Sequence, residues 1–162
     1  DMIGMTVVLG ILSLLGLYYM LIYINVVLQL ELFGFADAEF PPDKIDIYYK
    51  YMTVYFVCGI IILLLFISLI VFNILMMISK NNKKVIKFRK IYYILCGSTL
   101  LTILTNIFVV LGLDTNYQLV HRLVDFNNFY LPLIISGIFI ILLLVVMQSF
   151  TKDKLKKLEL VN

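Results

Sequence analysis

The chain has 162 residues, of which 63% are hydrophobic, whereas about half of a soluble domain is apolar. Its formal net charge is only +3, and its 13 basic and 10 acidic side chains all lie outside four long apolar runs. This composition excludes an ordinary soluble domain. The runs also lack the intramembrane ionisable residues that usually mark a proton or ion path. We expect a single membrane domain over residues 1–162.

The four runs cover residues 2–30, 51–78, 91–113 and 129–150. Each exceeds the roughly 20 apolar residues that a helix needs to cross a hydrocarbon core of about 30 Å. Membrane spans must be helices or strands of a closed barrel, and barrel strands would show about ten residues of alternating polarity. The sequence therefore predicts an all-α, four-helix transmembrane bundle, followed by an amphipathic tail at 151–162.

The connections between the runs differ in charge, and this difference predicts the topology. Residues 31–50 carry five acids and two lysines, whereas residues 79–90 carry six basic residues and no acid. Basic residues in short loops mark the cytoplasmic side of a membrane protein. We therefore expect a multi-pass integral membrane protein with both termini and 79–90 on that side. Nothing in the sequence indicates which membrane holds it.

The first run carries two distinctive faces. Tyr18, Asn25 and Gln29 form a polar stripe, because spacings of seven and four place them on one side of a helix. A second face contains small residues, including Ser13 and Gly16, that allow a neighbouring helix to approach closely. We interpret the stripe as a polar packing face, with a vestibule open to the outer side as the alternative.

The third run is the most polar of the four. Its small polar side chains fall on about one half of the helix, and the main ones are Ser98, Thr99, Thr102, Thr105 and Asn106. Because lipid penalises such a face, we expect it to point into the bundle. Interhelical packing is the preferred interpretation, since hydroxyl and amide side chains commonly join membrane helices. The alternative is the lining of a ligand cavity or pore.

The basic segment after the second run is expected to contact anionic lipid headgroups of the bilayer. Its charged residues are Lys80, Lys83, Lys84, Lys87, Arg89 and Lys90. Apolar residues alternate with them, as is typical of a segment at a membrane surface. We do not expect nucleic-acid binding, because a short segment held at a bilayer presents little surface.

The third connection contains a possible site on the outer surface, formed by Asp114, His121, Arg122 and Asp125. His121 and Asp125 would share a helix face. A metal site needs convergent ligands, and the chain has a single histidine and no zinc or EF-hand spacing. We therefore expect no metal and no cofactor.

The preferred functional hypothesis is an accessory or scaffold subunit, without catalytic chemistry, that joins other membrane protein subunits in a larger complex. The first alternative is a channel or transporter component that uses the polar face of the third run. The second alternative is a membrane enzyme that acts on a lipid-type substrate through the outer-surface group around His121.

Overall fold

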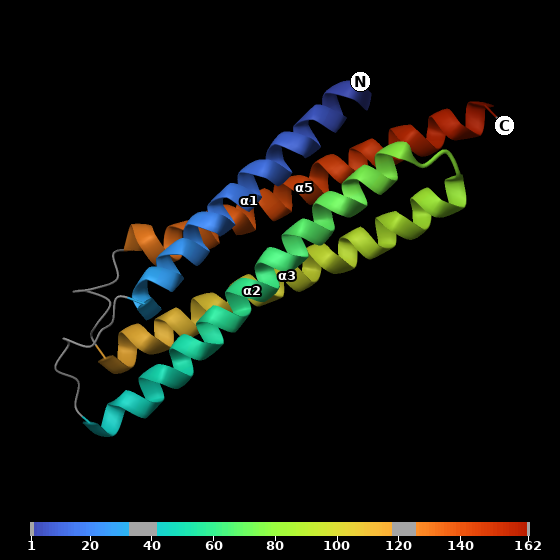
Figure 1. Ribbon diagram of the computed structural model, residues 1–162. Helices are drawn as coiled ribbons and strands as arrows, with labels where there is room; N and C mark the ends of the chain where they lie inside the picture. Colours follow the sequence, from blue (N-terminus) through green and yellow to red (C-terminus); the bar gives the residue numbers. More distant parts are fainter. Residues whose placement is uncertain (1, 33–41, 118–125, 162) are drawn as a thin grey trace.

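The computed structural model describes residues 2–32, 42–117 and 126–161. The described residues form four helices, which are α1 (Met2–Leu32), α2 (Pro42–Ile78), α3 (Asn82–Tyr117) and α5 (Phe126–Val161) (Figure 1). Each contains a stretch long and apolar enough to cross a membrane. The predicted all-α bundle of four membrane-spanning helices is therefore confirmed.

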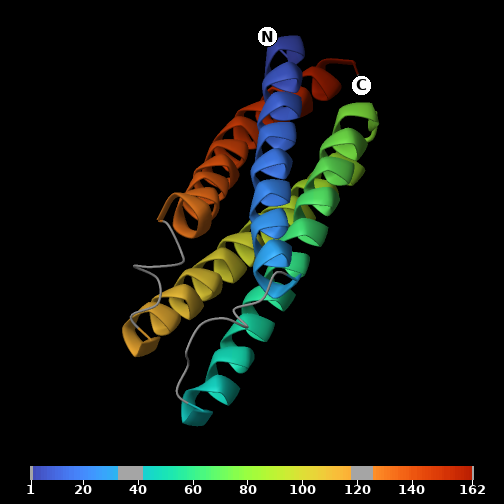
Figure 2. The same cartoon turned by 60° about the vertical axis from the view of Figure 1, so that its left-hand side comes forward.

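The helices form a ring around one core. Helix α1 packs against α2 and α5, and α3 packs against the same two helices. Neighbouring helices along the chain run in opposite directions, so both termini lie at the end of the bundle that carries the α2–α3 connection (Figures 1 and 2). Side chains from all four helices fill the core, including Leu9, Phe66, Ile103 and Leu143, which are almost completely buried.

The α2–α3 connection is much shorter than the basic segment at 79–90, since only residues 79–81 separate the two helices. Asn81 caps α3, because its Oδ1 accepts the backbone N–H groups of Lys83 at 2.9 Å and Lys84 at 3.3 Å. An asparagine at this position satisfies N–H groups that have no partner inside the helix. Most of the basic residues therefore lie on the first turns of α3 rather than in a loop.

The helices extend beyond the apolar runs of the sequence. Helix α2 begins at Pro42, where the fixed backbone angle of proline suits a first helical residue. Its 37 residues make a rod of about 55 Å, which is longer than the hydrocarbon core of a bilayer. Helix α5 continues without a break to Val161, so residues 151–161 of the expected tail are a direct extension of the last span.

Helices α1 and α2 approach each other closely at Gly16. A Cβ atom added there would overlap Cε1 of the Phe66 ring, and Phe66 is fully buried. Ser13, one turn earlier on the same face, is also buried. Ser13 and Gly16 thus lie against α2, and at Gly16 a larger side chain has no room.

We expect Gly16→Ala to lower the free energy of unfolding by about 1–3 kcal/mol, because the new methyl group must displace the Phe66 ring in a packed core. Thermal unfolding of the full chain in detergent measures this effect. Gly10→Ala is the matched control, since no atom lies within 4 Å of an added Cβ at that position. Equal unfolding temperatures for the two variants would contradict the close approach at Gly16.

Candidate functional site

The first buried polar cluster links α1 to α2 and lies beside α3. Asn73 Nδ2 donates to Ser13 Oγ at 2.9 Å, and the Ser13 hydroxyl donates to the Leu9 carbonyl of its own helix at 2.7 Å. The Tyr92 hydroxyl of α3 lies beside Asn73 and Cys96. Neither Tyr92 Oη nor Asn73 Oδ1 makes a well-formed hydrogen bond with the described residues. The cluster is thus a direct polar link between α1 and α2, bordered by α3.

Asn73 was not singled out among the candidate residues of the sequence analysis. It is the one amide side chain in the second apolar run, between Phe72 and Ile74. An amide in lipid is unfavourable without a partner, so its presence in so apolar a run was a usable signal for a buried interhelical contact.

The second buried polar contact joins α2 and α3 nearer the other end of the bundle. Asn106 is fully buried, and its Nδ2 donates to the backbone carbonyl oxygen of Tyr55 at 3.4 Å. Tyr55 is fully buried as well. Asn106 therefore links α3 to α2 by a hydrogen bond between a side chain and the backbone.

The predicted polar face of α3 lies partly in the core and partly on the exposed lateral surface of the bundle. Thr99 and Asn106 are buried and Thr102 is half-buried, but Ser98 and Thr105 are exposed. Each threonine hydroxyl donates to the carbonyl four residues earlier in its own helix. The expectation of an inward face fails for Ser98 and Thr105, because these residues spread over half of the helix while the core covers a narrower arc.

The polar stripe expected on the first run does not point into the core at Tyr18, which is 58% exposed. Its ring packs edge-on against Tyr19, with centroids 5.8 Å apart, and Tyr19 in turn contacts the Phe139 ring of α5. Asn25 and Gln29 lie on α1, but their side chains fall outside the described part of the structure.

The possible outer-surface group cannot be assembled from the described residues. Asp114 lies near the end of α3, and its side chain is outside the described part. His121, Arg122 and Asp125 are also outside the described residues. Within the described ranges, no group of three or more His, Cys, Asp or Glu residues is placed to hold a metal ion.

A third polar contact supplies a partner for the last carbonyl groups of α2. Lys154 of α5 is only 6% exposed, and its ammonium group donates to the carbonyl oxygens of Met76 and, at 2.6 Å, Met77. The last carbonyls of a helix lack partners within it, and a cation there also interacts favourably with the helix dipole. The Phe150 ring lies one turn earlier, with its centroid 5.8 Å from the ammonium nitrogen.

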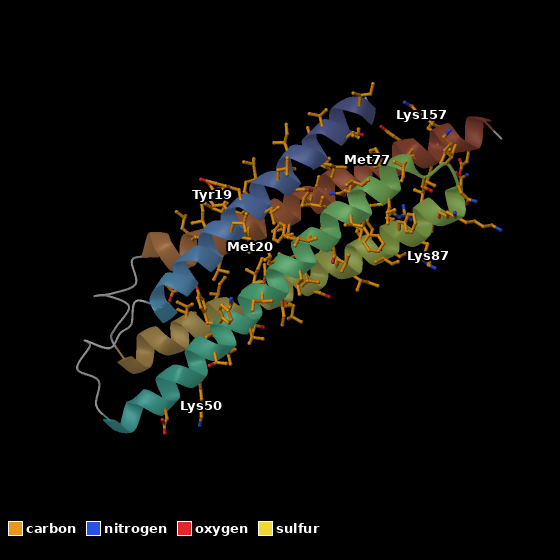
Figure 3. All side chains as sticks on the ribbon, in the orientation of Figure 1. Tyr19, Met20, Lys50, Met77, Lys87 and Lys157 are labelled. Carbon is orange, nitrogen blue, oxygen red and sulfur yellow. The ribbon has the colours of Figure 1, made fainter. Side chains whose placement is uncertain are left out.

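The residues expected to contact anionic lipid are mostly exposed. Arg89 is half-buried, and the exposed members are Lys80, Lys83, Lys84, Lys87 and Lys90. They lie at the same end of the bundle as the two termini (Figure 3 labels Lys87 there). The structure thus concentrates these charges at the end where α5 also terminates.

Seven buried polar side chains each donate a hydrogen bond to another helix or to their own backbone, and these are Ser13, Asn73, Thr99, Asn106, Ser136, Thr151 and Lys154. The hydrogen bonds between helices help to hold the four helices in one packed bundle. Comparison with known proteins finds no match for this chain among family models, curated proteins or solved structures.

We expect Lys154→Met to lower the free energy of unfolding by about 2 kcal/mol, because charged hydrogen bonds are lost and buried carbonyls stay unpaired. Thermal unfolding in detergent measures the loss. Lys157→Met is the control: Lys157 is exposed, and surface changes of this kind usually stay within about 0.5 kcal/mol. If both variants unfold like the unmodified chain, Lys154 does not stabilise the contact between α5 and α2.

Proposed function

We propose that this chain is an accessory or scaffold subunit of a larger membrane complex, and that the outer face of α3 binds a helix of another subunit. The single observation that carries this proposal is the outward position of three small residues in the middle of a membrane-spanning helix. These residues are Gly97, Ser98 and Thr105, all of which are exposed. Large apolar neighbours on the same face, Leu101 and Phe108, are 68% and 70% exposed.

The physical reason lies in how membrane helices associate. Lipid tails are as apolar as leucine, so helices associate through close packing rather than through the hydrophobic effect. Small residues let two backbones approach, and an added Cβ at Gly97 would meet no atom within 4 Å. Leu101 and Phe108 lie on the same face, about one and three turns beyond Gly97, and would contact a partner helix that rests on Gly97 and Ser98.

The division of the polar face is the reason to prefer a scaffold over a pore within one chain. A pore lining would need Ser98 and Thr105 to face the interior, together with Thr99 and Asn106. Two of these residues are instead exposed, and Asn106 is engaged with α2. The proposal therefore assigns the buried members to holding the bundle and the exposed members to binding a neighbour.

The proposal also places the protein in the membrane with both termini on the cytoplasmic side. The support is the charge of the end where the termini lie. The short connection and the first turns of α3 contain six basic residues and no acid, whereas the first connection is acidic. Positive charge in short cytoplasmic segments is the general rule for such proteins.

The experiment replaces Gly97 and Thr105 with Leu, which fills the space on α3 and should remove the partner proteins that co-purify after mild solubilisation. Quantitative mass spectrometry of the purified complex measures the recovered partners. Ile141→Phe on the exposed face of α5 is the control and should leave their recovery unchanged. Thermal unfolding checks that the Gly97/Thr105 variant is folded.

Unchanged recovery of every partner from the folded Gly97/Thr105 variant would overturn the assignment of α3. The purified complex could instead contain only copies of this chain and dissociate in the Gly97/Thr105 variant. That result would show a homo-oligomer in place of a larger complex with other subunits.

A further inference from the structure

We propose that the end of the bundle bearing the α2–α3 connection binds the headgroups of anionic phospholipids, and that α5 supplies half of this surface. The inference concerns a different region from the mid-membrane face of α3 and does not depend on the proposed complex. It also extends the sequence expectation, which assigned lipid contact to residues 79–90 alone.

The α3 half of the surface consists of lysines on one exposed stripe. Lys83, Lys87 and Lys90 are separated by four and three residues, so they share a helix face, and all three are exposed. The same spacing continues to Ile94, which is 68% exposed. The row of lysines on this face is therefore followed, one turn later, by an exposed apolar residue.

This order of residues matches a phospholipid rather than a free anion. A phospholipid presents its phosphate at the membrane margin and its acyl chains immediately below. On α3, the exposed Lys90 is followed after one turn by the exposed Ile94. A soluble phosphate ion would gain nothing from an apolar side chain at this position.

The lysines on α3 also need counter-charges. Lys83 and Lys87 are four residues apart on a helix, where like charges repel. They lie near the helix N-terminus, whose partial positive charge disfavours cations. Asn81 already occupies the first backbone N–H groups of α3. An anion would therefore bind through the lysine side chains, and its charge would relieve their repulsion.

The α5 half of the surface is held in place by the buried Lys154. Through its contacts with the last carbonyls of α2, Lys154 fixes the final turns of α5 beside the α2–α3 connection. Lys152, Lys156 and Lys157 on these turns are exposed. Figure 3 shows Lys87 and Lys157 on opposite sides of this end of the bundle, so cations lie on more than one side of it.

The test is native mass spectrometry of the full chain in detergent, titrated with dioleoylphosphatidylglycerol or dioleoylphosphatidylcholine. The unmodified chain should bind the anionic lipid more tightly. Replacing Lys83 and Lys87 with Gln should weaken anionic-lipid binding by about fivefold per lysine, and so should Lys156→Gln with Lys157→Gln. Lys50→Gln, an exposed change on α2 at the opposite end, is the control and should leave it unchanged.

Equal affinity for the two lipids, or an equal loss from Lys50→Gln, would overturn the proposal. If only the α3 variant loses affinity, the α5 half is refuted. Excess inorganic phosphate should not displace the bound lipid, and complete displacement would assign the surface to free anions instead. Each variant changes exposed side chains only, and thermal unfolding verifies that a loss of binding is not a loss of fold.

Discussion

The arrangement of this bundle depends on one constraint: a polar group at membrane depth is unfavourable unless it finds a partner inside the protein. The backbone meets it by forming helices. Asn73 meets it by donating to Ser13 across α1 and α2, and Asn106 by donating to a carbonyl of α2. Serine and threonine hydroxyls meet it within their own helix, as at Thr99. The two amides therefore link specific pairs of helices, α1 with α2 and α2 with α3.

The same need for partners applies at the α2–α3 end of the bundle, where the helix termini leave backbone groups without partners in their own helix. Three residues connect α2 to α3, and Asn81 satisfies the start of α3 while Lys154 satisfies the end of α2. Both devices bind backbone groups that helix termini leave without partners. One consequence is that α5 reaches α2 through Lys154 beyond the apolar run, and the exposed lysines of α5 then lie at the end that carries those of α3.

Hydropathy and charge were sufficient to predict the number of spans and the all-α fold, because lipid imposes the same requirement on every spanning segment. They could not predict which arc of α3 is covered, since Ser98 and Thr99 are adjacent in sequence yet exposed and buried respectively. The Lys154 contact joins residues 78 positions apart. Its lysine resembles any other basic residue of the tail until the end of α2 is known in space.

A double-mutant cycle of Ser13→Ala and Asn73→Leu, followed by thermal unfolding in detergent, measures whether the buried Asn73 amide joins α1 to α2. We predict a coupling free energy of about 0.6 kcal/mol, and at most about 1.7 kcal/mol, which are the average and the maximum for hydrogen bonds between membrane helices. Ser68→Ala with Asn73→Leu is the matched control, because the Ser68 hydroxyl donates to its own helix at Leu64. A Ser13–Asn73 coupling no larger than that of the control pair would contradict the account.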